Sequence, residues 1–145
     1  MKRSVILFWV SLFSIAMGLL ECVVVIYLRK IYYPEGFSFP LKIIDPDIIS
    51  IELLREAATL IMLLAVGAIS GRTSTEKFGC FIYSFAVWDI FYYIFLKLLI
   101  GWPQSLLTWD ILFLLPVTWT SPVLAPLINS ITMILLAWLI ISFKL

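Results

Sequence analysis

Four long apolar stretches set the strongest limit on what this chain can fold into. Each is at least as long as the roughly 20 apolar residues that a helix needs to cross a bilayer core of about 30 Å. The chain is 63% hydrophobic and 13% charged, whereas soluble domains carry about 25% charged residues. We therefore predict an all-α, polytopic transmembrane four-helix bundle, one integral membrane domain over residues 1–145, with spans at about 4–28, 50–70, 78–100 and 122–143.

The first apolar stretch begins like a secretory signal. Met1-Lys2-Arg3 precedes the apolar run, and Ala16-Met17-Gly18 has the small residues of a cleavage site. The run nevertheless continues to Tyr27, which gives about 24 residues, the length of a membrane span. We expect it to stay in place as the first helix.

Residues 101–121 are apolar but too short to cross a membrane. About 11 residues, SLLTWDILFLL, precede Pro116, and they give roughly 16 Å of helix. The segment predicts a half-helix over about 105–115, which lies at one membrane interface or dips into it. We expect this helix to end near Leu115, because the proline follows.

Positive charges outside the spans predict the orientation. Five of them (Lys2, Arg3, Arg72, Lys77 and Lys144) fall on the side of the termini, and three (Arg29, Lys30 and Lys42) fall on the other side. Cytoplasmic loops carry the excess of Lys and Arg. We therefore expect a multi-pass protein of the plasma or inner membrane with both termini cytoplasmic.

The tripeptide Trp-Asp-Ile occurs twice, at 88–90 and 109–111, and both aspartates have apolar neighbours. At 100° per residue, the polar side chains of the first three spans each fall on one face, and most lie in the outer half of the bundle. A charge in lipid costs several kcal/mol unless it faces the interior and pairs. We expect one cluster with an excess of two negative charges, in which five acids (Glu21, Glu52, Glu56, Asp89 and Asp110) face three bases (Arg29, Arg55 and Lys97).

An outward-facing pocket built on this cluster fits the one-sided distribution of charge. Carboxylates in apolar surroundings can differ in pKa, so that one acts as acid and another as base. We expect the pocket to bind a lipophilic or amphipathic small molecule, or to act on it by acid–base chemistry. The candidate catalytic residues are Glu21, Glu56, Asp89 and Asp110, and the candidate ligand-binding residues are Arg29, Glu52, Arg55, Tyr93, Lys97, Trp109 and Asn129.

Two alternatives use the same residues. The charges can be ion pairs that only hold a structural or accessory membrane subunit together, because lipid supplies no hydrophobic drive between helices. They can also serve a proton- or cation-coupled small transporter or channel, in which homo-oligomers build a route between protomers. The apolar inner half of the bundle disfavours transport through one chain, but enzyme, binder and transporter all stay open.

Several function classes lack their usual residues. The chain has no histidine, and its two cysteines, Cys22 and Cys80, form no CxxC motif. No phosphate-binding loop, nucleophile motif or metal motif occurs. We expect no cofactor, no metal centre and no nucleic-acid partner, although a cation held by carboxylates alone stays open. The expected partners are the lipid bilayer and the small-molecule ligand.

Three phrases have the character of family signatures: VVVIYLRKIYYPEGF, ELLREAATL and GWPQSLLTWDILFLLP. With them, the whole chain resembles small prokaryotic four-span integral membrane proteins. The resemblance implies the four-span fold. It implies no activity, so no residue takes a role from it.

Overall fold

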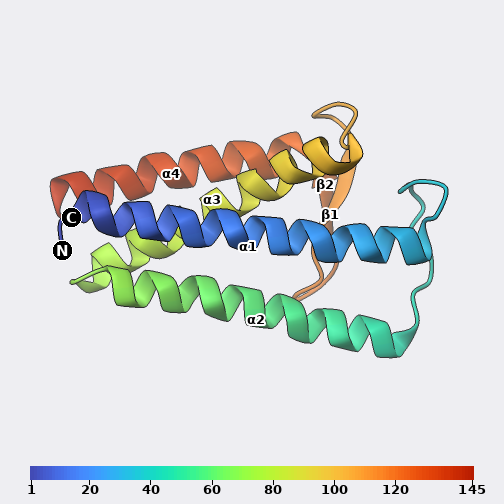
Figure 1. Cartoon of the computed structure of the whole chain (residues 1–145), viewed down its shortest axis with the longest axis horizontal. Coiled ribbons are helices and arrows are strands. Elements are labelled where there is room, and N and C mark those ends of the chain that lie inside the picture. The colour runs from blue at the N-terminus through green and yellow to red at the C-terminus, as the bar shows by residue number, and fades with distance from the viewer.

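The computed structural model describes residues 1–145 as four helices and a two-stranded hairpin (Figure 1). The elements are α1 (Arg3–Tyr32), α2 (Pro46–Ser70), α3 (Ser74–Ile100), β1 (Trp109–Phe113), β2 (Trp119–Pro122) and α4 (Leu124–Phe143). All four helices are long and apolar enough to cross a membrane. Both termini and the α2–α3 turn lie at one end, called the termini end below, and the α1–α2 linker (33–45) lies at the other, the linker end (Figure 1).

Local sequence explains where the middle helices begin and end. The Asp45 side chain caps α2 by accepting the N–H of Asp47 at 2.9 Å, and Pro46 suits the first turn of a helix. Thr73 caps α3 by accepting the N–H of Glu76 at 3.1 Å. Gly101 ends α3 in the left-handed region, with φ 68°. The four predicted helices are present, and most run a few residues past the predicted spans.

α3 is the central helix of the molecule. It packs against α1, α2 and α4, and 61% of its most apolar window is buried, against 17% for α4. Glycines allow two of these contacts to be close. A Cβ on Gly67 would lie 2.6 Å from the Cα of Phe81, and one on Gly18 would lie 2.9 Å from the Trp88 carbonyl oxygen. Small residues at such crossings let helix backbones approach closely.

The predicted half-helix over 105–115 is wrong. Residues 109–113 form strand β1, which pairs antiparallel with β2, with Asp110 opposite Ser121 and Trp109 opposite Pro122. Tryptophan, isoleucine, phenylalanine and threonine dominate the two strands, and these residues favour the pleated conformation. A helix of about 11 residues is only marginally stable by itself, so pairing with residues 119–122 decides the outcome. As predicted, the chain turns back here without running from one end of the bundle to the other.

The hairpin lies across the helices, running from the start of α4 toward α2 (Figure 1). A two-stranded sheet is marginally stable alone, and backbone hydrogen bonds fix its base to the start of α4. The N–H of Val123 donates to Thr108 at 2.9 Å, and that of Leu124 donates to Leu106 at 2.8 Å. The hairpin is therefore held at α4 as well as by its own strand pairing.

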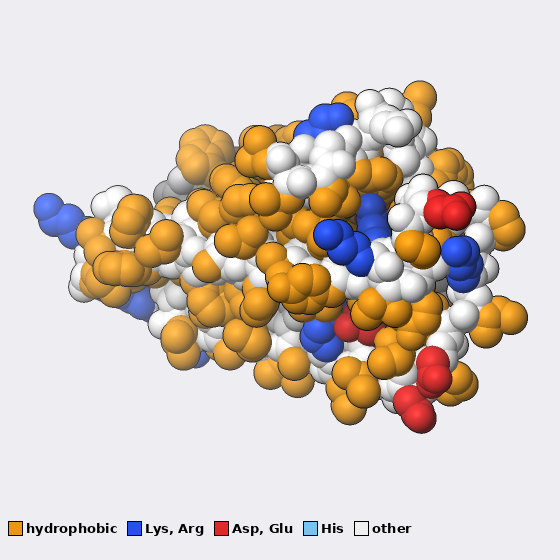
Figure 2. Space-filling model, turned by 45° about the vertical axis from the view of Figure 1, so that its right-hand side comes forward, with side chains coloured by type: hydrophobic (Ala, Val, Ile, Leu, Met, Phe, Trp, Pro, Cys, Tyr) orange, Lys and Arg blue, Asp and Glu red, His pale blue; other side chains and the backbone are white.

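Hydrophobic side chains cover most of the visible face of the molecule (Figure 2). Basic side chains stand at both ends of this view, whereas the acidic ones are seen only toward the linker end and among the hydrophobic side chains (Figure 2). The helices expose large apolar residues along their length, among them Phe8, Leu64, Ile69, Leu98 and Leu135. This distribution is typical of helices whose outer faces meet an apolar solvent.

Candidate functional site

A cavity of about 1440 Å³ opens between the four helices, the α1–α2 linker and the hairpin, in the half of the molecule nearer the linker end. Of its 37 lining residues, 24 are hydrophobic. Ligand pockets usually measure about 300–1,000 Å³ and combine an apolar wall with a few placed polar groups. The polar side chains on this wall include nine of the eleven candidate residues: Glu21, Arg29, Glu52, Arg55, Glu56, Asp89, Tyr93, Asp110 and Asn129.

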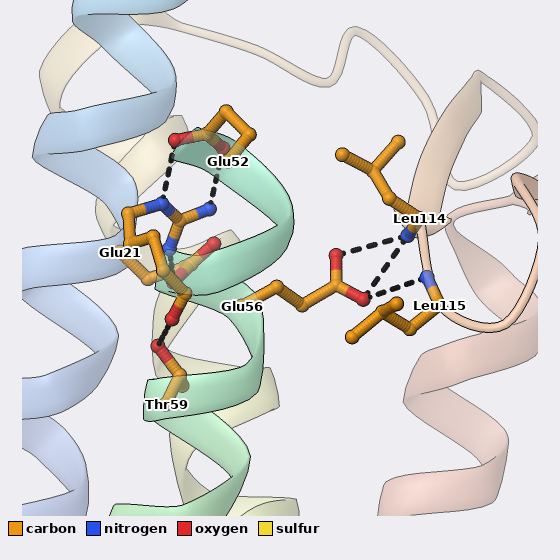
Figure 3. A network of polar contacts seen from close by, with 7 residues as sticks. Glu21, Glu52, Glu56, Thr59, Leu114 and Leu115 are labelled. Carbon is orange, nitrogen blue, oxygen red and sulfur yellow. Dashed lines mark hydrogen bonds and ion pairs between the residues drawn. The ribbon is translucent and has the colours of Figure 1, made fainter. Parts of the chain in front are cut away.

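Arg55 joins α1 to α2 at the cavity wall. Its guanidinium donates to both carboxylate oxygens of Glu52, one turn away, at 2.8 Å each. Its third nitrogen, Nη1, donates to Glu21 on α1 at 2.5 Å. Figure 3 shows the two acids on either side of the guanidinium. The planar fork of arginine matches such a bidentate contact, so one cation here holds two acids.

Glu56 points away from this group toward the hairpin (Figure 3). Its carboxylate accepts the backbone N–H groups of Leu114 and Leu115 at distances from 2.9 to 3.2 Å. These residues begin the loop between the strands, where Pro116 follows and the ladder offers them no partner. Glu56 is 9% exposed, so the contact is a buried, charge-assisted link between α2 and the tip of the hairpin.

Arg29, Asp110 and Tyr93 form a third polar group. Asp110 accepts the Arg29 Nη2 at 3.2 Å, the Tyr93 hydroxyl at 2.9 Å and its neighbour Ile111 N–H at 2.8 Å. Burial raises the pKa of Asp110 above its ordinary value, and the positive charge of Arg29 and these hydrogen bonds oppose the rise. The first of the two Trp-Asp-Ile aspartates, Asp89, lies elsewhere on the wall.

Two aromatic rings, with their planes 89° apart, pack against the Arg29 guanidinium. Its central carbon lies 4.4 Å from the centre of the Phe37 ring and 3.8 Å from that of Trp102. Stacking of this kind favours arginine over lysine. The arrangement brings together the end of α1, the linker and the residues after α3, and it holds the guanidinium at the cavity wall.

Asp89 is the one candidate acid with neither an ion pair nor a backbone donor. It accepts one hydrogen bond, from the buried Ser130 hydroxyl of α4 at 2.8 Å, and it forms no ion pair. Asn129 lies beside Ser130 in the chain and lines the cavity, where its side chain donates to the Met133 sulfur at 3.6 Å. The predicted acids thus line one cavity, but hydrogen bonds divide them into separate groups.

Two candidate residues do not line the cavity. Lys97 donates to the carbonyl oxygens of Gly101 and Pro103 at 3.4 and 2.9 Å, because carbonyls at the end of a helix attract a nearby cation. Trp109 is 51% exposed and packs edge-on against Phe39. Lys42 of the linker lines the cavity in place of Lys97, so the five cavity acids still face three bases and the formal excess is two negative charges.

The structure adds residues that sequence reasoning did not select. Phe37 and Trp102 gave no sign of stacking on Arg29, since they are distant in the chain. Trp88 lines the cavity with its indole N–H buried and no acceptor of the protein within reach. The sequence analysis selected Asp89 from the first Trp-Asp-Ile tripeptide but did not select Trp88.

No group of three carboxylate or thiol side chains is arranged to hold a metal ion. The two cysteines are buried and unpaired, Cys22 on α1 and Cys80 on α3. No family model, curated protein or solved structure matches this chain. What the site can do chemically follows from its shape and its groups: it can enclose an apolar molecule, orient a polar head and exchange a proton with a carboxylate.

Proposed function

We propose that this chain is a multi-pass integral membrane protein that binds a lipophilic or amphipathic small molecule in the cavity beneath the hairpin. The observation that carries the proposal is the cavity itself, because it is large, mostly apolar and yet lined by five carboxylates and two guanidinium groups. A soluble ligand would not require a mainly hydrophobic wall of this size. A purely structural core would be expected to pack without such a space.

A membrane location is supported by the four apolar helices and by the large apolar residues on their outer faces. The termini end holds the five basic residues that favour a cytoplasmic position. In this orientation the linker, the hairpin and the cavity belong to the outer half of the bundle. A ligand would then enter from the outer leaflet or from the outer aqueous side.

Asp89 is the best candidate for proton transfer to or from the ligand. Glu21 and Glu52 are paired with Arg55, and Asp110 is paired with Arg29. Glu56 is occupied by two backbone N–H groups. Only Asp89 has neither a paired cation nor a backbone donor. Its carboxylate is therefore the one free to exchange a proton with a bound molecule.

Paired tryptophan substitutions on α2 test the proposal. Leu60 lines the cavity, whereas Leu64, one turn away, is 54% exposed and does not line it. Leu60→Trp adds a bulky ring to the cavity wall and should reduce labelling by a single-chain photoactivatable alkyl probe at peptides of that wall. Leu64→Trp should leave that labelling unchanged. Equal labelling of both variants would show that the probe binds only the lipid-facing surface, and the proposal would fail.

A scaffold role is the second candidate, because each of the five acids already has a partner within the protein. Arg55 in particular links two helices. If the charges serve only as a scaffold, every substitution among them should lower stability, and no probe should enter the cavity. The stability measurements described in the Discussion separate the two functions.

A further inference from the structure

We infer that the head group of the ligand is a neutral oxygen acceptor, such as an ester or ketone carbonyl, bound by the Nη1 of Arg29. The inference rests on the proposed function, since it names the class of molecule that the same cavity would take. Arg29 lines the cavity and its side chain is 11% exposed. Its Nη1 is buried, and no acceptor of the protein lies within hydrogen-bond distance.

The surroundings of Arg29 restrict how a ligand can approach it. Phe37 and Trp102, whose ring planes are 89° apart, occupy two sides of the guanidinium, and Asp110 takes the Nη2. The N–H groups of a guanidinium lie in its plane. A partner for Nη1 must therefore approach edge-on, which a carbonyl oxygen does readily.

The groups on the cavity wall that lack a hydrogen-bond partner are donors and not acceptors. Each carboxylate on the wall receives at least one hydrogen bond from the protein. The buried N–H of Trp88 has no protein partner either. Because buried polar groups normally find a partner, the missing component of this site is an oxygen acceptor.

Charge selects among the possible acceptors. Arg29 is already neutralised by Asp110, and the five acids of the cavity exceed its three bases, Arg29, Arg55 and Lys42, by two formal charges. A carboxylate or phosphate head would add to this excess. A cationic head would find the acids already bonded and would leave the Nη1 without a partner. A neutral carbonyl satisfies the donor without an electrostatic penalty.

Three probes with the same chain distinguish these classes: methyl dodecanoate, dodecanoate and dodecylamine. We would measure equilibrium binding of each radiolabelled probe to the protein in nanodiscs at neutral pH, with empty nanodiscs as the blank. The ester should bind tightest. Arg29→Lys keeps the charge that pairs with Asp110 but not the second nitrogen, and it should weaken ester binding about 3- to 10-fold, as expected for one lost hydrogen bond.

Lys97→Met is the matched control, because Lys97 is a basic residue near the end of its helix that lies outside the cavity. It should leave ester binding unchanged. Tighter binding of the amine or of dodecanoate would overturn the inference, as would unchanged ester binding by Arg29→Lys. If no probe binds above the blank, the proposed function itself fails. If Arg29→Lys does not fold, Trp102→Leu replaces it. Loss of the ring that packs on Arg29 should likewise weaken binding of the ester.

Discussion

Glu56 and Leu114 join α2 to the hairpin through a side chain on one side and the backbone on the other. Both carboxylate oxygens of Glu56 accept the Leu114 N–H, at 2.9 and 3.2 Å, and one also accepts the Leu115 N–H. The two strands have no third strand to support them. This carboxylate therefore holds the tip of the hairpin, whereas backbone hydrogen bonds to the start of α4 hold its base.

Glu56→Leu should release the tip of the hairpin. It leaves two backbone N–H groups without an acceptor, and an unsatisfied buried group costs about 1–3 kcal/mol. We expect a loss of roughly 2–5 kcal/mol in stability and faster hydrogen exchange over residues 109–122, measured by mass spectrometry. The exposed Glu35 supplies the control, Glu35→Leu, which should change neither quantity. Unchanged exchange in Glu56→Leu would mean that the helices hold the hairpin without the carboxylate.

Arg55→Ala should destabilise the contact between α1 and α2. It strands Glu21 and Glu52, and removal of one partner of a buried pair costs about 3–5 kcal/mol, less here because these side chains are partly exposed. The melting temperature in detergent should fall clearly below that of the wild type. Arg72→Ala, at an exposed arginine of the α2–α3 turn, should melt like the wild type. Similar melting of both variants would remove Arg55 from the scaffold.

Asp89→Asn should melt at the same temperature as the wild type or higher. Asp89 has no cation to lose, and the asparagine oxygen still accepts from Ser130, while one charge of the negative excess disappears. The same substitution should abolish any proton transfer to a bound ligand. A fall in melting temperature as large as that of Arg55→Ala would favour the scaffold function instead.

Asp110 should give the protein a distinct pH dependence. Because burial raises its folded pKa above the ordinary 3.8, the folded state binds this proton more tightly than the unfolded state. The stability of the wild type relative to Asp110→Asn should therefore rise as pH falls through the raised pKa toward 3.8. Paired melting curves across this range cancel the other titrating groups. If the relative stability instead fell as the pH was lowered, the charge of Arg29 would outweigh the burial of Asp110.

Single cysteines at the two ends test the orientation. Thr75 at the termini end and Gln104 beyond α3 are both exposed, and the two native cysteines are buried. We expect Thr75→Cys to react only from the cytoplasmic side with an impermeant maleimide, and Gln104→Cys only from the outside. Labelling of both positions from one side would contradict the four-span topology.

Helices were predictable because their signal is local. An apolar run of spanning length is visible in any short window. The caps at Asp45 and Thr73 are local signals too, but the predicted spans at 50 and 78 began after the observed helix starts at Pro46 and Ser74. The periodicity of polar residues also placed Glu21, Glu56 and Asp89 on faces that line one cavity. These features depend on the nearest residues in the chain.

The hairpin and the Arg29 site were not predictable for the opposite reason. A short apolar run such as 105–115 is compatible with a helix or a strand, and only pairing with residues 119–122 distinguishes them. Phe37 and Trp102 reach Arg29 through the tertiary fold. The predicted place of Lys97 in the cluster was wrong. Its ammonium group binds carbonyl oxygens just beyond its own helix and does not pair with Asp89, eight residues earlier.

The central position of α3 has a consequence for how the chain is made. Its apolar window has the lowest mean hydropathy of the four and the largest buried share, so it is the helix least suited to enter lipid alone. Chain order places it third, after the two helices that cover two of its sides, and the short turn at residues 71–73 ties it to α2. We expect α2 and α3 to leave the insertion machinery together as one unit, with α4 completing the assembly after its synthesis.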